Sequence, residues 1–283
     1  MIDIKDYGNY ETAWCPGCGN FAILNTVKET LVECDLKPHQ VLFVSGIGQA
    51  AKAPHYLNAN LFDGLHGRSL PVATGAKLAN HKLVVIVESG DGCMYGEGGN
   101  HFLAAIRRNI DITVLVHNNQ IYGLTKGQAS PTSDEGFVTK AQPFGVLSEP
   151  FHPLSMAVSM HAGFVARSFS GNTEHLKNMI AQAIKHKGFS LVDILQPCVS
   201  FNKVNTFAWY KKRSYELASD YDPTDWNEAI KKAAEWGDKI PIGVIYKCER
   251  ESFEHKFDVL KKRALVELPY DVKAVKDFMK NFE

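Results

Sequence analysis

Two polar segments each follow an apolar run of the chain, and their residue types could hold a metal ion. Asp91 stands between two glycines after the run 83–87, and Asn119 ends an Asn-Asn pair after the run 112–116. A carboxylate oxygen of Asp91, an amide oxygen of Asn119 and the backbone carbonyl oxygen of Ile121 are hard ligands of the kind that Mg²⁺ prefers. Mg²⁺ keeps water or phosphate oxygens in its remaining positions, so a diphosphate could complete the site.

A βαβ unit would bring these residues together. Both apolar runs are short and rich in β-branched residues, which predicts buried parallel strands, and apolar positions 102, 103, 105 and 106 predict a helix between them. Short right-handed connections place the carboxyl ends of both strands at one edge of the sheet, where open α/β sheets bind ligands. Asp91 and Asn119 should then face one crevice. The alternative is that Asp91 only caps the helix and Asn119 only makes a turn.

The spacing of the two segments is more specific than either segment alone. Gly-Asp-Gly at 90–92, a spacer of 25 residues (93–117) and Asn-Asn at 118–119 resemble the binding motif for thiamine diphosphate. A Gly-Asp-Gly by itself occurs in many turns between a strand and a helix, whereas the whole pattern predicts a cofactor site.

Cysteines form a second group of candidate ligands. Cys15 and Cys18 have the spacing of iron–sulfur or zinc ligands and precede a helix predicted from about Phe21 to Cys34. On this spacing alone, a redox dithiol is a comparable alternative. Cys198 follows the last predicted strand, and we expect Cys34 to be structural. Six cysteines in a reducing compartment are more typical of thiols or metal ligands than of disulfides.

Cationic residues could bring positive charge to the same crevice. Gly46-Ile47-Gly48 turns the chain after the predicted strand Val41–Ser45, and Lys52 follows shortly afterwards. Lys52 would reach the crevice, or it would only extend along a helix with its amine in water. His66 and Arg68 flank a glycine and could both reach one anionic group, unless they belong to a plain surface turn.

Composition and patterning set the fold class. The 283 residues are 45% hydrophobic, and 31 basic residues balance 31 acidic ones, which gives no electrostatic reason for binding nucleic acid or an anionic membrane. Five predicted strands alternate with helices: 41–45, 83–87, 112–116, 164–167 and 190–195. This pattern predicts a doubly wound, mostly parallel α/β sheet.

We expect residues 1–204 to form the cofactor-binding domain and residues 205–283 to form an extension that packs on it or on a partner. No apolar run is long enough to span a bilayer and the N-terminus does not look like a signal peptide, so we expect a cytoplasmic protein.

Several segments together resemble the β subunit of 2-oxoacid:ferredoxin oxidoreductases. The matching segments are WCPGCGN at 14–20, SGIG at 45–48, HGRSLPVATG at 66–75, GDG at 90–92, RRN at 107–109, NNQIYGLTKGQASPT at 118–132 and QPCVSFN at 196–202. They extend over about two thirds of the chain in the expected order.

The resemblance implies half of an active site. In that family the β subunit holds the pyrophosphate-binding domain for thiamine diphosphate and a [4Fe-4S] cluster, and the α subunit holds the pyrimidine-binding domain with the activating glutamate. The implied reaction is oxidative decarboxylation of a 2-oxoacid to acyl-coenzyme A, with electrons passed through the cluster to ferredoxin, in an αβ or (αβ)₂ assembly. A non-oxidative thiamine diphosphate-dependent decarboxylase subunit, a pyruvate-specific enzyme and a cluster-binding scaffold subunit are the alternatives.

The resemblance also assigns residues. It implies Mg²⁺ ligands at Asp91, Asn119 and Ile121, and iron ligands at Cys15, Cys18 and Cys198. It implies cofactor contacts from Ile47, Gly48, His66, Gly92, Gly123 and Leu124. We also expect cofactor contacts from Gln49, Gly90, Cys93, Asn118 and Tyr122, and substrate contacts from Lys52, Arg68, Thr125 and Lys126.

Two departures from the family pattern bear on the cluster and the cofactor. Gln49 stands where many members have a fourth cluster cysteine, and Cys93 stands where many have an aspartate. We expect the cluster to persist on three cysteines, with an oxygen or nitrogen ligand, water or Cys93 as the fourth, and zinc as the alternative metal. Because a cation at Lys52 favours a distal carboxylate, we expect 2-oxoglutarate rather than pyruvate as substrate.

Overall fold

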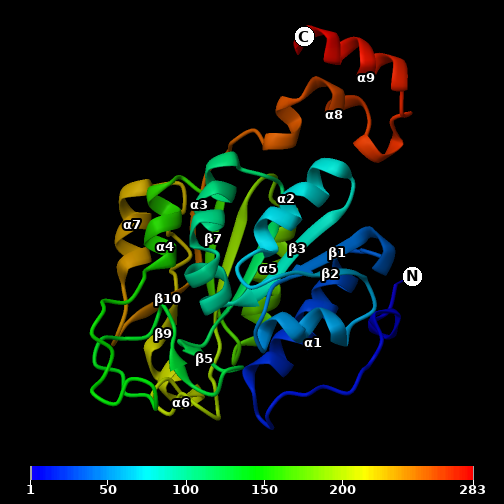
Figure 1. Ribbon diagram of the computed structural model, residues 1–283. Helices are drawn as coiled ribbons and strands as arrows, with labels where there is room; N and C mark the ends of the chain where they lie inside the picture. The colour runs from blue at the N-terminus through cyan, green and yellow to red at the C-terminus, as the bar shows by residue number, and fades with distance from the viewer. Residues whose placement is uncertain (1, 283) are drawn as a thin grey trace.

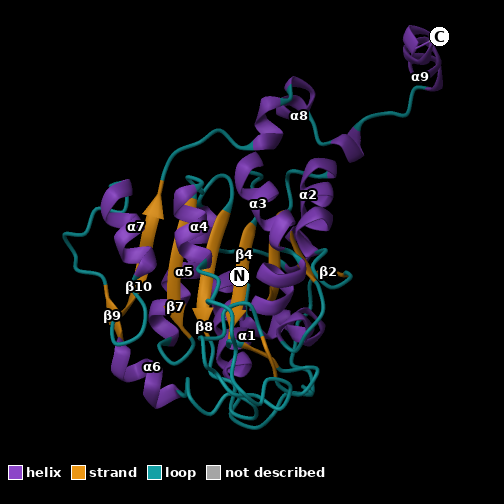
Figure 2. Ribbon diagram, turned by 60° about the vertical axis from the view of Figure 1, so that its left-hand side comes forward, coloured by secondary structure: helices purple, strands orange, loops and turns teal. Residues whose placement is uncertain are grey.

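The computed structural model describes residues 2–282, which contain one eight-stranded sheet with helices on both faces (Figures 1 and 2). In spatial order the strands are β2 (Asn60–Asp63), β1 (Val41–Ser45), β3 (Val84–Gly90), β4 (Thr113–Asn118), β8 (Ser190–Leu195), β7 (Phe164–Phe169), β10 (Ile240–Lys247) and β9 (Ser214–Glu216). The strands from β2 to β7 in this order are parallel, while β10 is antiparallel to β7 and parallel to β9. A doubly wound, mostly parallel sheet is therefore confirmed.

The five predicted strands form the consecutive centre of this sheet. Their residues are apolar on both sides because both faces are covered: Val85 and Val87 of β3 belong to one apolar cluster, and Ile86 belongs to the other. Such near-continuous apolar runs are typical of parallel strands buried between two helical layers.

The helices form one layer on each face. One layer contains α2 (Ser69–Ala79), α3 (Gly99–Arg108), α4 (Pro153–Ser159) and α7 (Trp226–Ala234), and the other contains α1 (Gly19–Glu33) and α5 (Thr173–Lys185). The amphipathic pattern of α3 explains its placement, since Phe102, Ala105 and Ile106 are buried and its two terminal arginines are exposed. Figure 2 shows helices of both layers flanking the strands.

Three strands of the main sheet were not among the five predicted. β2 has only four residues and is exposed along its whole length, so it carries no apolar signal. β10 contains Pro241 and Gly243, which disfavour strand, and pairing with β7 through an irregular register overrides that preference. Between the Gly-Asp-Gly segment and α3, the chain also forms a short π-helix, η4 (Gly92–Glu97), a feature that often marks functional sites.

The C-terminal third divides into two parts. Residues up to Lys247 contribute α6 (Phe207–Arg213), β9, α7 and β10 to the sheet and its layers. The segments α8 (Asp258–Lys262) and α9 (Val272–Met279) stand away from the sheet at the end opposite β5 (Figure 1), and Lys82 ties this tail to the body through an ion pair of 2.5 Å with Glu267. Among the helices of residues 2–282, none combines the length and apolar character that crossing a lipid bilayer requires.

Candidate functional site

A cavity of about 110 Å³ lies at the carboxyl ends of β1, β3 and β4. Fourteen of its fifteen lining residues were predicted from the sequence as metal, cofactor or substrate residues, and the fifteenth is Ala50. The lining residues are Ile47, Gly48, Gln49, Ala50, His66, Gly90, Asp91, Gly92, Cys93, Asn119, Ile121, Tyr122, Gly123, Leu124 and Thr125. The parallel topology thus brings together segments that range from residue 47 to residue 125 in the chain.

Asp91 lies at the start of η4 and is 1% exposed. One carboxylate oxygen, Oδ2, accepts hydrogen bonds from the hydroxyls of Ser130 at 2.5 Å and Thr132 at 2.7 Å. Burial raises the pKa of the Asp91 carboxyl to about 6, and the negative charge of nearby Asp193 adds to the rise, while the two hydroxyls oppose it. A buried carboxylate with raised pKa is a group that a metal ion would favour in its charged form.

Asn119 and Ile121 form a tight turn beside Asp91. The Asn119 Oδ1 accepts the Ile121 backbone N–H at 3.1 Å, and Gln120 between them has a left-handed φ of 56°. Ile121 then begins the short strand β5 (Ile121–Tyr122), which pairs with β6 (Gln128–Ala129). An amide oxygen, a carboxylate and a backbone carbonyl therefore line one cavity, which is the donor chemistry that Mg²⁺ requires.

Two buried polar atoms of the cavity lack a hydrogen-bond partner among the described residues: His66 Nδ1 and Gln49 Oε1. Unsatisfied buried groups are rare in native proteins and suggest a missing ligand. Gly92 must be a glycine, because a Cβ atom there would lie 2.1 Å from the Tyr122 ring. Cys93 is 2% exposed, and its sulfur accepts the backbone N–H groups of Gly67 at 3.2 Å and Ile47 at 3.4 Å. These features fit a polar cofactor in the cavity.

Asn118 is the one predicted cofactor residue that does not line the cavity. Its Nδ2 donates to both carboxylate oxygens of Asp193, and its Oδ1 lies 2.9 Å from the Thr132 hydroxyl, whose single hydrogen is shared between Asn118 and Asp91. Asn118 is thus placed behind Asp91 and supports it through Thr132.

The predicted substrate residues are separated in the structure. Lys52 lines a neighbouring hollow of about 340 Å³, together with His55 and Asp63, and this hollow shares Ile47, Gly48 and Leu124 with the cofactor cavity. Thr125 lines the cofactor cavity and donates its hydroxyl to Gln128. Arg68 is exposed and contacts His101 at 2.5 Å, and Lys126 is exposed as well; neither lines these two cavities.

The three predicted iron ligands, Cys15, Cys18 and Cys198, line a second cavity of about 40 Å³. It shares Gln49, Asn119 and Gly123 with the cofactor cavity, so the two cavities are adjacent. Burial raises the pKa of the Cys18 thiol to about 11, with smaller contributions from Cys198 and Cys15. Across residues 2–282, no three His, Cys, Asp or Glu side chains are grouped closely enough to hold a metal ion. The thiols therefore provide suitable donors but are not yet arranged as ligands.

Sequence reasoning missed the polar residues that support the two cavities. Ser130 and Thr132 hold Asp91, Asp193 holds Asn118, and Gln196 lines the cysteine cavity and contacts Asn119. The signals were present, since Ser130 and Thr132 belong to the loop after Asn-Asn and Gln196 immediately precedes Pro197-Cys198.

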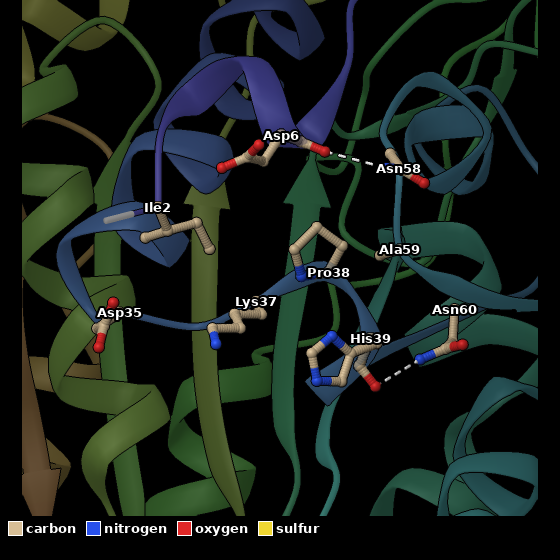
Figure 3. Close-up of a pocket in the computed structure, with 9 residues that line it drawn as sticks. All are labelled: Ile2, Asp6, Asp35, Lys37, Pro38, His39, Asn58, Ala59 and Asn60. Atoms are coloured by element: carbon tan, nitrogen blue, oxygen red, sulfur yellow. Dashed lines mark hydrogen bonds between the residues drawn. The ribbon is translucent and has the colours of Figure 1, made fainter.

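A wider hollow of about 810 Å³ lies near the N-terminus, away from these motifs (Figure 3). Its two asparagine side chains, Asn58 and Asn60, donate to the backbone carbonyls of Asp6 and His39, as the dashed lines show. Among the described residues that line this hollow, none has a buried polar side-chain atom without a hydrogen-bond partner, in contrast to His66 and Gln49 of the cofactor cavity.

Comparison with known proteins agrees with this geometry. Residues 41–194 match the family described as thiamine pyrophosphate enzyme, C-terminal TPP binding domain, and residues 198–262 match the family of the C-terminal region of the pyruvate ferredoxin oxidoreductase beta subunit. The first match contains the strands and loops that build the cofactor cavity from β1 to β8, and the second begins at Cys198.

Individual relatives point the same way. A 2-oxoacid:ferredoxin oxidoreductase subunit beta of Sulfolobus sp is 47% identical over 83% of this chain and 82% of its own length. A 2-oxoglutarate oxidoreductase subunit KorB of Mycobacterium tuberculosis is 46% identical over 70% of this chain and 53% of its own length. The solved structure of a 2-oxoglutarate:ferredoxin oxidoreductase from Magnetococcus marinus, with 2-oxoglutarate, coenzyme A and succinyl-CoA bound, superimposes with a TM-score of 0.91 at 33% identity, covering 98% of this chain and 96% of that one. The chain therefore belongs to the β subunits of the 2-oxoacid:ferredoxin oxidoreductases.

Proposed function

We propose that this chain binds the diphosphate end of thiamine diphosphate and, with an α subunit, oxidatively decarboxylates 2-oxoglutarate to its acyl-coenzyme A product, passing electrons to ferredoxin. The observation that carries the proposal is the cofactor cavity. It combines oxygen donors from Asp91, Asn119 and Ile121 with the unpartnered polar atoms of His66 and Gln49, directly beside the three-thiol cavity.

Each part of the cavity has a distinct proposed role. Asp91, Asn119 and the Ile121 carbonyl hold Mg²⁺, and His66 and Gln49 contact the cofactor through the groups that now lack partners. Bound thiamine diphosphate supplies the electron sink that decarboxylation of a 2-oxoacid requires. The chain offers no acid for the pyrimidine ring in this proposal; that glutamate belongs to the α subunit.

We also propose that Cys15, Cys18 and Cys198 bind a [4Fe-4S] cluster. The shared wall of the two cavities, formed by Gln49 and Asn119 with Gly123, supports short-range electron transfer from the cofactor to the cluster. The fourth iron ligand is an oxygen or nitrogen donor or water, since Cys93 lines the cofactor cavity and its sulfur accepts two backbone N–H groups there.

The choice of 2-oxoglutarate rests on Lys52. Its side chain lines the 340 Å³ hollow that adjoins the cofactor cavity, where an ammonium group can bind a second, distal carboxylate. Several relatives are named as 2-oxoglutarate enzymes, which supports this choice over pyruvate. Arg68 and Lys126 remain proposed substrate contacts only for a substrate that extends beyond the cofactor cavity and the hollow that contains Lys52.

The assembly is proposed to be cytoplasmic and either αβ or (αβ)₂. Residues 1–204 would carry the cofactor, and residues 205–283 would serve as the extension that packs on the domain or on the partner. Helix α9 supports contact with another subunit, because none of its residues is buried.

One experiment tests the proposal directly. The chain is purified anaerobically together with its α subunit, and thiamine diphosphate, Mg²⁺, iron and acid-labile sulfide are measured on the same sample. Ferredoxin reduction is then followed with 2-oxoglutarate and with pyruvate in the presence of coenzyme A. We expect all four components and faster reduction with 2-oxoglutarate. Carbon dioxide release without iron would instead identify a non-oxidative decarboxylase, and faster reduction with pyruvate would contradict the substrate assignment.

A further inference from the structure

Gln196, the residue directly after β8, contacts both candidate sites with one side chain. It is 1% exposed. Its Oε1 accepts a hydrogen bond from Asn119 Nδ2 at 3.0 Å, and its Nε2 donates to Cys18 Sγ at 3.5 Å and to the backbone carbonyl of Pro197 at 2.8 Å. A proposed Mg²⁺ ligand and a proposed iron ligand are therefore joined by a single amide.

The position of this amide is fixed by its surroundings. The Gln196 backbone N–H donates to the carbonyl of Asn118 at 2.9 Å, which continues the pairing of β8 with β4. On the other side lies Gly19, the first residue of α1. A Cβ atom on Gly19 would lie 2.8 Å from Gln196 Cγ and 3.2 Å from Nε2, so a larger residue would displace the side chain.

The hydrogen bonds also determine which way the Asn119 amide faces. Asn119 Nδ2 donates to Gln196, and Asn119 Oδ1 accepts from the N–H of Ile121, a residue that lines the cofactor cavity. If the Gln196 contact were lost, only the Ile121 N–H would hold the orientation of the Asn119 amide, and rotated amides that present nitrogen in place of oxygen would become more populated. Nitrogen of an amide is not a ligand for Mg²⁺.

The contact with Cys18 acts on the other site. Hydrogen bonds to cluster sulfurs are one of the factors that set the reduction potential of an iron–sulfur cluster. An N–H donor stabilises negative charge on sulfur, and the reduced cluster carries one more negative charge than the oxidised one. The Gln196 N–H therefore favours the reduced state of a cluster that Cys18 binds.

We propose that Gln196 is a positioning residue shared by the two sites, which presents the Asn119 oxygen to Mg²⁺ and raises the reduction potential of the cluster through Cys18. This inference rests on the proposed function, because it requires a cluster at the cysteines. It adds a role for a residue that neither binds the cofactor nor supplies a cluster ligand.

Two substitutions separate the two contacts. Gln196→Met keeps the length of the side chain but can neither accept from Asn119 nor donate to Cys18. Gln196→Glu can accept from Asn119 but, when ionised, cannot donate to Cys18. Gln182→Met, on an exposed position of α5, introduces the same chemical change away from both sites and serves as the control.

The assembled αβ complex is titrated in two ways. Redox titration followed by EPR measures the cluster potential, and titration with Mg²⁺ and thiamine diphosphate measures cofactor affinity. Both Gln196 variants should lower the ratio of reduced to oxidised cluster at a given potential by about tenfold, a shift of about 59 mV for one electron. Only Gln196→Met should also weaken Mg²⁺-dependent cofactor binding, by about tenfold. The control should match the wild type in both measurements.

The outcomes separate this inference from the proposed function. Unchanged potential and unchanged cofactor affinity in both variants, in a complex that binds iron and cofactor normally, would overturn the role of Gln196 and leave the proposed function intact. A wild-type complex without iron would refute the proposed function and the cluster half of this inference together. If Gln196→Met does not fold, Gln196→Glu still decides, because an unchanged potential in that variant contradicts the Cys18 contact.

Discussion

The cofactor cavity and the cysteine cavity share a wall, yet they differ in how their chemical groups are held. In the cofactor cavity, Asp91 is buried at the end of a central strand, and Ser130 and Thr132 fix one of its oxygens. In the cysteine cavity, Cys15 is exposed and precedes the first helix, while Cys198 follows the last parallel strand. The strands of the sheet fix the position of the cofactor site, whereas the cysteine site lies on two connecting segments, one before α1 and one after β8.

Cys18 and Asp91 also differ in protonation. Burial raises the pKa of Cys18 to about 11, so this thiol holds its proton at neutral pH, whereas the pKa of Asp91 is raised only to about 6. A metal ion must displace protons from its cysteine ligands. The cofactor cavity therefore already contains its oxygen donors, whereas Cys18 must lose a proton before it can bind iron.

The largest effect is expected from removing the carboxylate of the cofactor site. Asp91→Ala should weaken Mg²⁺-dependent binding of thiamine diphosphate by at least about 100-fold, since it removes the only anionic ligand that this chain contributes to the proposed metal site. The fold should persist because no apolar packing is lost, although the Ser130 and Thr132 hydroxyls lose a buried acceptor and the melting temperature should fall by about 2–8 °C. Isothermal titration of the variant with cofactor and Mg²⁺ measures the first quantity and calorimetric unfolding the second. Normal cofactor affinity in a folded variant would disprove the assignment of Asp91.

The next largest effect is expected from removing a thiol of the cysteine cavity. Cys198→Ala should abolish iron binding in the anaerobic complex, because the remaining two thiols cannot hold a cluster. Cofactor affinity should stay within about threefold of the wild type, since the cofactor cavity does not depend on the thiols for its shape. Cys34→Ala, at the end of α1, makes the same change outside the cavity and should retain iron. Iron analysis and cofactor titration on both variants provide the measurement; retained iron in Cys198→Ala would exclude this residue as a ligand.

The contrast also explains what the sequence could predict. The cofactor site follows from rules of local pattern and topology: apolar runs predict parallel strands, and their carboxyl ends predict where Asp91 and Asn119 meet. No such rule locates Arg68 or Lys126. Their side chains were expected near the substrate, but they are exposed and line neither the cofactor cavity nor the hollow that contains Lys52. Their direction depends on local loop geometry, such as the left-handed φ of 72° at Lys126.

Supporting residues were harder to predict for a physical reason. Asn109 belongs to the matching segment RRN, yet its side chain is fully buried and binds the backbone of Arg250, Glu251 and Phe189, so its role is to tie the C-terminal region to the sheet. Gln196 likewise acts through contacts with residues that are distant in sequence. Polar side chains of this kind carry no periodic signal, and only the folded chain shows which groups they satisfy.

A third, smaller effect is expected on substrate preference alone, without a change at the cofactor cavity or the cysteine cavity. Lys52→Ala should lower kcat/KM for 2-oxoglutarate relative to pyruvate by about 10- to 100-fold, since a hydrogen bond to a charged group contributes about 1.5–3 kcal/mol. Cofactor affinity and iron content should remain unchanged, because Lys52 lines the neighbouring hollow and lines neither the cofactor cavity nor the cysteine cavity. Lys239→Ala, at an exposed position, is the control for loss of a positive charge. An unchanged ratio of the two specificity constants would exclude Lys52 as the selector.

The smallest effect is expected on the pH dependence of stability and of metal binding, both of which follow from the protonation of Asp91. Burial raises the pKa of the Asp91 carboxyl from 3.8 to about 6, so the metal-free folded protein binds more protons than the unfolded chain in this interval, and its unfolding free energy should fall as pH rises from about 4 to 6. Metal binding has the opposite dependence because Mg²⁺ requires the ionised carboxylate. With a pKa of about 6, the ionised fraction falls about tenfold between pH 7 and pH 5, and the affinity for a divalent ion should fall by the same factor. Mn²⁺ can replace Mg²⁺ in an EPR titration without cofactor, which avoids titration of the diphosphate. Asp91→Asn should bind the ion weakly at both pH values, and a wild-type affinity that does not change with pH would contradict Asp91 as the ligand whose proton the metal displaces.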